Sequence, residues 1–152
     1  MEEIFNNKGI ITVLNNIKKN FEITERLPDQ IGPLKLAYLG DAVYELIIRT
    51  VLMDERERPV KKMNKKAQSL VNATTQAEVA VVITDDLSEE EKAVFLRGRN
   101  AKSSSVSKHS DIHDYRIATG LESLFGYLYL KDDMERAVEF VKIAFDRLDL
   151  DI

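Results

Sequence analysis

Apolar residues concentrate in two long stretches of the chain, 33–53 and 110–133. In the first stretch they fall on almost every side of a helical projection, which predicts a central helix buried all round. In the second stretch they recur at helical spacing, at Ile117, Leu121, Leu124 and Leu128. The pattern therefore predicts two long apolar helices.

Shorter apolar patterns predict five further helices. They span about 9–21, 59–72, 75–83, 88–98 and 133–148. The fourth opens with Ser88 and Glu91 at the spacing of a capping box, and we expect a loop or frayed extension after it, from residue 99 to 110. Only the β-branched run at 79–83 resembles a strand, so the predicted class is all-α, with about seven helices in one domain.

Each long helix carries a carboxylate beside glycine. Asp41 follows Gly40, and Glu122 lies between Gly120 and Gly126. Glycine inside a helix costs about 1 kcal/mol relative to alanine, so close approach of another backbone is the expected reason for it. The two helices could then bring Asp41 and Glu122 together.

An alternative for the first helix is an ordinary solvated strip. Its polar residues follow one stripe at helical spacing, comprising Tyr38, Asp41, Glu45 and Arg49. A Glu45–Arg49 ion pair would explain that stripe without any chemistry.

Composition agrees with a small globular protein of 152 residues, 44% hydrophobic and 32% charged. The absence of cysteine excludes disulfides and thiolate metal sites and suits a reducing compartment. The acidic start Met1-Glu2-Glu3 does not resemble a signal peptide, and no stretch has the uninterrupted apolar length of a membrane span. We therefore expect a cytoplasmic protein that does not enter a membrane.

The net charge of −4 conceals two segments that contain no acid, 58–77 and 92–110. Such segments are often only solvated faces, but two of them in an acidic protein favour a surface that binds a polyanion. Their side chains include donors that suit phosphate and ribose oxygens, namely Lys61, Lys65, Arg97, Arg99, Asn100 and Lys102.

Other candidate chemistry is weaker. His109 and His113 are spaced for a zinc site, but the chain has only two histidines, which favours ordinary surface residues. The run 103–105 places serines near His109, yet no G-x-S-x-G elbow surrounds them. No phosphate-binding G-x-x-x-x-G-K-[ST] loop is present either.

The two carboxylate helices resemble a known family. LAYLGDAVYEL is similar to the signature of the ribonuclease III catalytic domain, and GLESLFGYLYL to that family's second carboxylate helix. The short chain and the segment RGRNAKS most resemble Mini-III ribonucleases, which lack a double-stranded-RNA-binding domain. We accordingly divide the chain into an N-terminal extension, 1–32, and a ribonuclease III-like catalytic domain, 33–152.

This resemblance implies that Asp41 and Glu122 are the catalytic residues and hold Mg²⁺, which Mn²⁺ can replace. Two further acids of the family are absent, since Ala37 and Thr119 occupy their positions, as in Mini-III proteins. Glu45 and Asp114 remain candidates for an outer shell only. The family works as a two-fold dimer, in which Tyr38 matches the aromatic residue that enters the partner subunit.

By the same resemblance, the substrate is double-stranded RNA, in particular precursor large-subunit (23S) ribosomal RNA, with a ribosomal protein as a possible helper. Two other functions stay open. One is a non-catalytic relative that binds RNA or the ribosome, although a binding protein has little reason to keep both Asp41 and Glu122 beside glycine. The other is a helical protein-interaction module, which would not retain duplex RNA at moderate salt.

Overall fold

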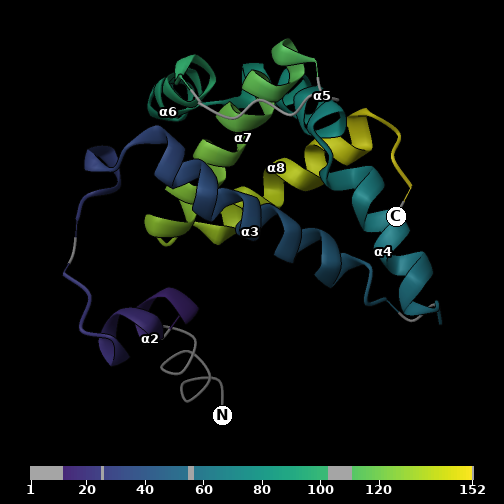
Figure 1. The fold of residues 1–152 in the computed structure, drawn as a ribbon, viewed down its shortest axis with the longest axis horizontal. Helices are drawn as coiled ribbons and strands as arrows, with labels where there is room; N and C mark the ends of the chain where they lie inside the picture. Colours follow the sequence, from purple (N-terminus) through teal and green to yellow (C-terminus); the bar gives the residue numbers. More distant parts are fainter. Residues whose placement is uncertain (1–11, 25, 55–56, 103–110, 152) are drawn as a thin grey trace.

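The computed structural model describes residues 12–24, 26–54, 57–102 and 111–151. Within these ranges the chain forms seven α-helices and no strand, so the all-α prediction is confirmed (Figure 1). They are α2 (Val13–Asn20), α3 (Pro33–Val51), α4 (Val60–Val71), α5 (Ala73–Ile83), α6 (Glu89–Asn100), α7 (Ile112–Leu130) and α8 (Met134–Arg147). Short 3-10 turns occupy Pro28–Gln30 and Thr84–Asp86. None of the described helices has the length and apolar character needed to cross a membrane.

Polar side chains set the starts of most helices. The predicted capping box forms, because Ser88 Oγ accepts from the Glu91 N–H while the Glu91 carboxylate accepts from the Ser88 N–H. Asp133 likewise caps α8 by accepting from the Arg136 N–H. The predicted helix at 9–21 begins at Val13, after the Thr12 cap; residues 9–11 lie outside the described ranges.

The central helix is α7, not the helix at 33–53. α7 packs against α3, α5, α6 and α8 (Figure 1). Every residue from 117 to 128 is buried except Glu122, which is partly buried. α3 instead covers one side of α7 and leaves Tyr38 85% and Leu46 61% exposed. The prediction that 33–53 is buried all round is therefore wrong. The side of α3 that carries Tyr38 and Leu46 faces outward.

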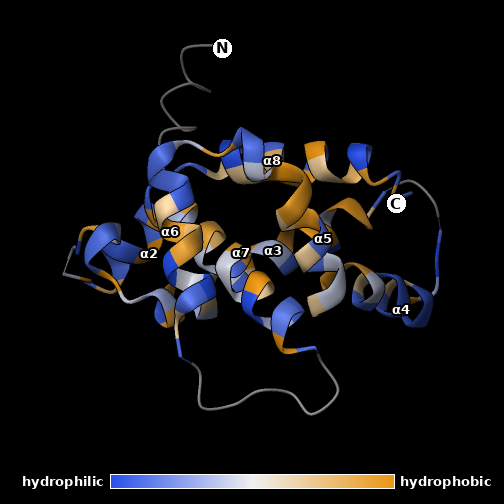
Figure 2. Ribbon diagram, turned by 90° about the horizontal axis from the view of Figure 1, so that it is seen from above, coloured by the Kyte–Doolittle hydropathy of each residue, from blue (hydrophilic) through white to orange (hydrophobic). Residues whose placement is uncertain are grey.

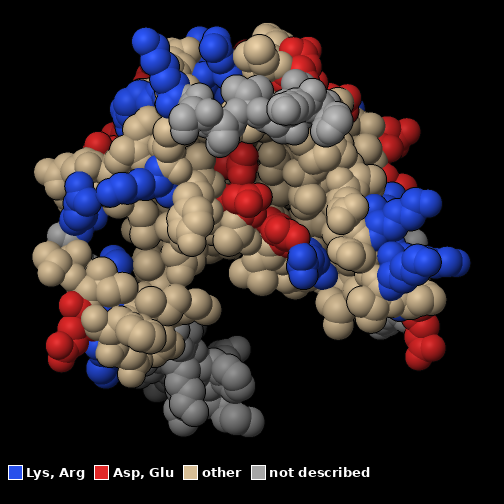
Figure 3. Space-filling model, viewed as in Figure 1, with Lys and Arg blue, Asp and Glu red and all other residues tan. Residues whose placement is uncertain are grey.

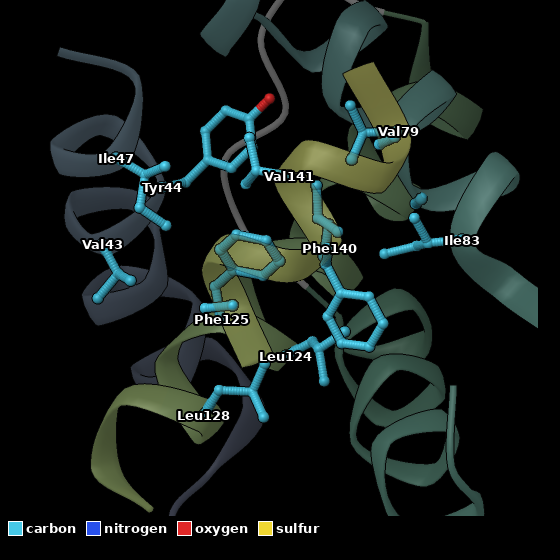
Figure 4. Packing of buried hydrophobic residues seen from close by; sticks show 14 of the residues in the cluster. Val43, Tyr44, Ile47, Val79, Ile83, Leu124, Phe125, Leu128, Phe140 and Val141 are labelled. Atoms are coloured by element: carbon cyan, nitrogen blue, oxygen red, sulfur yellow. The ribbon is translucent and has the colours of Figure 1, made fainter. Parts of the chain in front are cut away.

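Aromatic and branched side chains from α3, α5, α7 and α8 fill the core (Figure 4). The Tyr44 and Phe125 rings lie 5.6 Å apart at a tilt of 59°. The Tyr44 hydroxyl donates to the Leu70 carbonyl at 2.9 Å and so ties α3 to the end of α4. Figure 2 shows the complementary picture, with hydrophobic residues toward the middle of the molecule and a mostly hydrophilic α4 at its edge.

Glycines let α3 and α7 touch through their backbones. A Cβ built on Gly40 would lie 1.6 Å from the Glu122 carbonyl oxygen, and one built on Gly126 would lie 2.0 Å from the Leu36 carbonyl oxygen. Neither site can accept a side chain without moving a helix. The close approach predicted from Gly40 and Gly126 is confirmed.

A third close contact corrects the predicted end of α6. A Cβ on Gly98 would lie 2.3 Å from Ser123 Oγ, so this glycine serves packing against α7 and does not end the helix. α6 continues through Asn100. Arg97, Arg99 and Asn100 are thus helical residues: for Arg99 and Asn100 the structure shows an extension of the helix and not the loop that was the other expectation.

A partly buried ion pair joins α6 to α8. The Arg136 guanidinium donates to both oxygens of Glu91, at 3.0 and 3.1 Å, and to the Asp86 carbonyl at 2.8 Å. Burial alone would raise the pKa of Glu91, but the hydrogen bonds from Arg136 and Ser88 lower it below its usual value. This contact holds the capped start of α6 against the bundle.

We predict that Gly40→Ala destabilises the fold by about 3 kcal/mol or more, because the added methyl group meets backbone atoms that cannot rotate away. Urea unfolding measures the loss. Gly32→Ala is the matched control, since a Cβ at Gly32 meets nothing within 4 Å, and its effect should stay within about 1 kcal/mol. Equal stability of the two variants would contradict the backbone contact.

Candidate active site

Asp41 and Glu122 lie side by side where α3 crosses α7. Their placement follows from the glycine contact, since Asp41 comes directly after Gly40 and the Glu122 backbone is what Gly40 touches. Burial, the charge of Asp41 and a hydrogen bond to Asp41 raise the pKa of Glu122 to about 8. Near neutral pH and without a metal, the Glu122 carboxyl group therefore stays largely protonated.

Ser123, which is not among the residues predicted from the sequence, anchors this crossing. Its hydroxyl is fully buried and lies 2.8 Å from the Pro33 carbonyl and 2.9 Å from the Thr119 carbonyl. The first contact fixes the start of α3 against α7, one residue from Glu122. A hydroxyl within an apolar stripe, adjacent to a carboxylate, was the available signal.

The polar stripe on α3 continues away from the pair. Glu45 accepts from Arg49 Nε at 3.0 Å and from Nη2 at 2.5 Å, as the ion-pair alternative predicts. Tyr38 is the most exposed large hydrophobic residue of the helix. The stripe thus combines an ordinary ion pair, Glu45–Arg49, with Asp41, whose carboxylate instead contacts Glu122 on α7.

The positions of the two missing family acids supply no carboxylate. Ala37 is buried, and the buried Thr119 hydroxyl donates to the Tyr115 carbonyl at 2.9 Å. Among the predicted family positions that the structure describes, only Asp41 and Glu122 therefore offer a carboxylate.

This donor set fits one hard divalent cation. Mg²⁺ takes oxygen ligands, keeps several waters and commonly binds through one or two carboxylates plus a substrate phosphate. A cation would also offset the charge of Asp41, which opposes ionisation of Glu122. No group of three or more His, Asp and Glu suitable for a metal occurs within the described ranges, so Asp41 and Glu122 would depend on water and phosphate for the remaining ligands.

Asp114 does not join the pair. It borders a separate hollow between α5 and the start of α7, together with Glu78 and His113, and neither Asp41 nor Glu122 lines that hollow. His109 and the serines at 103–105 lie outside the described residues.

Basic side chains flank the acidic pair. Figure 3 shows acidic side chains gathered in the hollow over the middle of α3, with basic side chains over α6 on one side and over α4 on the other. All six predicted RNA-binding residues are exposed, namely Lys61, Lys65, Arg97, Arg99, Asn100 and Lys102. Arg99 Nε donates to Asn100 Oδ1 at 3.2 Å.

Comparison with known proteins places this arrangement in a family. Residues 34–133 match the ribonuclease III domain. The Mini-ribonuclease 3 of Clostridium tetani is 44% identical over 126 residues, which cover 82% of this chain and 83% of that protein. The Mini-ribonuclease 3 of Thermoanaerobacter is 44% identical over 114 residues, covering 75% of this chain and 80% of that protein.

A solved structure agrees. An X-ray crystal structure of a Fusobacterium nucleatum protein superposes with a TM-score of 0.69 at 32% identity, covering 77% of this chain and 93% of that one. The chain belongs to the ribonuclease III domain family and, within it, to the Mini-ribonuclease 3 group. Membership makes it an endoribonuclease, in a family that is generally metal-dependent.

The raised pKa of Glu122 predicts how the stability of the metal-free protein depends on pH. A carboxyl group whose pKa is higher in the folded state favours folding at low pH, and this contribution is lost as pH rises toward 8. A tenfold change in an acid dissociation constant corresponds to about 1.4 kcal/mol, so the loss of folding free energy amounts to several kcal/mol.

Urea unfolding in EDTA between pH 5 and 9 measures this loss, with Glu122→Gln as the reference. The free energy of unfolding of the parent should fall relative to that of Glu122→Gln as pH increases. Parallel curves for the two proteins would show that Glu122 titrates normally.

Proposed function

We propose that this protein cleaves double-stranded RNA by metal-assisted hydrolysis at the Asp41–Glu122 pair. The observation that carries the proposal is the crossing of α3 and α7, which holds an exposed Asp41 beside a partly buried Glu122. A binding protein would gain nothing from this arrangement, because it raises the cost of ionising Glu122. The non-catalytic alternative is therefore disfavoured.

Asp41 and Glu122 would both be ionised in the working enzyme and would hold Mg²⁺, or Mn²⁺ in its place. When bound, the cation supplies Lewis-acid activation of a water and neutralises charge on the phosphodiester. The protein itself contributes by holding the two carboxylates in position. Asp41 is exposed and accessible to substrate, whereas Glu122 is partly buried and held by the packed backbone of α7.

The basic surfaces on α6 and α4 would bind the RNA backbone. They lie on both sides of the acidic hollow, so a duplex that spans them passes over that hollow (Figure 3). Arginine and lysine side chains contact phosphates without reading bases, which suits recognition of duplex shape. Arg97, Arg99, Asn100 and Lys102 would act on one side, and Lys61 and Lys65 on the other.

Two copies of the chain would supply one active site for each strand. α3 leaves an apolar strip open, with Tyr38 85%, Leu46 61% and Leu34 41% exposed. Such a strip beside a catalytic pair favours a two-fold contact between subunits. Tyr38 is then an interface residue, and residues 33–152 form the catalytic domain, with 1–32 as an extension.

The substrate we favour is the double-stranded stem of precursor 23S ribosomal RNA in the cytoplasm, with a ribosomal protein as a possible helper. Support comes from the similarity to Mini-ribonuclease 3 proteins together with the absence of acid from both basic segments. A duplex stem offers the two strands that two sites require.

The direct test is incubation of the protein with duplex RNA and Mg²⁺, with and without EDTA. Asp41→Asn and Glu122→Gln should each reduce cleavage by more than about 100-fold, because each replaces a charged oxygen ligand with a neutral amide. The double variant should lose little more, since the two residues act as one unit.

Asp114→Asn is the matched control, an acid on α7 that borders a different hollow, and it should cleave at the parent rate. Near-parent cleavage by Asp41→Asn would remove Asp41 from the site.

The dimer has its own test. Tyr38→Ala should weaken dimerisation by about 2 kcal/mol, or roughly 30-fold in Kd, if Tyr38 is a buried anchor at the interface. Sedimentation or light scattering across a concentration series measures this. Val81→Ala, which truncates a side chain that is 63% exposed on α5, should leave the dimer unchanged. Identical dissociation of both variants would refute the interface role.

A further inference from the structure

We propose that Arg49, held in place by Glu45, is a binding site for an RNA backbone phosphate between the catalytic pair and α4. The inference rests on the proposed cleavage of duplex RNA. It assigns a function to a side chain that the sequence alone explains as half of an ordinary ion pair.

The geometry of the pair leaves Arg49 available. Nε and Nη2 both donate to the same Glu45 oxygen, and no described residue accepts from Nη1. The Arg49 side chain is 65% exposed, whereas that of Glu45 is 34% exposed. Glu45 thus fixes one edge of the guanidinium and leaves another edge open. An arginine restrained in this way loses less conformational freedom when it binds an anion.

Arg49 also lies between the Asp41 site and the lysines of α4 that are proposed to bind RNA. It lies eight residues after Asp41 on α3, or about 12 Å along the helix axis. It lines a hollow of about 560 Å³ between α3 and α4, together with Asn64 of α4. Lys61 precedes Asn64 by one turn and Lys65 follows it directly. A backbone that leaves the Asp41 site toward these lysines therefore passes Arg49.

Electrostatics supports the same path. Glu45 is an acid on the strip that the RNA would cross, and without a partner it would repel phosphates. Arg49 neutralises this charge and adds donors of its own, which match phosphate oxygens. Stability gives a weaker reason for the pair, because an exposed ion pair at this helical spacing contributes only a few tenths of a kcal/mol.

The test measures duplex RNA binding in an Asp41→Asn background, which prevents cleavage, across a range of salt concentrations. Adding Arg49→Ala should weaken binding about tenfold and reduce the slope of log affinity against log salt by about one. Arg49→Lys should keep the slope but recover only part of the affinity, because lysine lacks the planar fork. With Asp41 intact, Arg49→Ala should raise KM more than it lowers kcat.

Lys142→Ala is the matched control. It breaks another exposed ion pair at the same spacing, Lys142–Asp146 on α8, and should change neither affinity nor slope appreciably. If Arg49→Ala behaves like Lys142→Ala while the parent protein cleaves duplex RNA, the phosphate site is wrong and the proposed function stands. If the parent neither binds nor cleaves duplex RNA, both proposals fall.

Discussion

The backbone contact between α3 and α7 determines the rest of the structure. Gly40 and Gly126 remove the side chains that would keep the helices apart, so carbonyl groups of one helix lie against the glycine of the other. The same contact makes α7 the centre of the bundle and brings Asp41 to Glu122. Packing and chemistry are thus coupled at one crossing, and a change that separates the helices also dismantles the acidic pair.

The pair is costly for the folded chain in the absence of a cation. Burial and the charge of Asp41 oppose ionisation of Glu122, and no basic side chain in the described ranges forms an ion pair with either carboxylate. Elsewhere the chain places its acids beside arginines, as Glu91 does with Arg136 and Glu45 with Arg49. Asp41 and Glu122 differ from these acids because they have no arginine partner among the described residues. We therefore expect a bound ligand to balance their negative charge.

Local signals in the sequence predicted much of this arrangement. Ser88 and Glu91 have the spacing of a capping box, and the glycines beside Asp41 and Glu122 indicated a close helix contact. Features that depend on distant residues could not be predicted. Gly98 looked like the end of α6 because its real reason, a close contact with Ser123 on α7, is not visible in the local sequence. The ion pair between Arg136 and Glu91 likewise joins residues that are 45 positions apart. The exposed side of α3 carries Leu34, Tyr38 and Leu46 among its polar residues, so the apolar pattern alone did not show that this side faces outward.

The central claim is that Asp41 and Glu122 form one cation site whose proton is displaced by the metal. Calorimetric titration with Mn²⁺ at pH 7, in buffers of different ionisation enthalpy, counts the protons released on binding. With the pKa of Glu122 at about 8, the parent protein should release close to one proton for each ion bound. Glu122→Gln should bind more weakly and release none. Tight binding without proton release by the parent, or equal release by Glu122→Gln, would contradict the account.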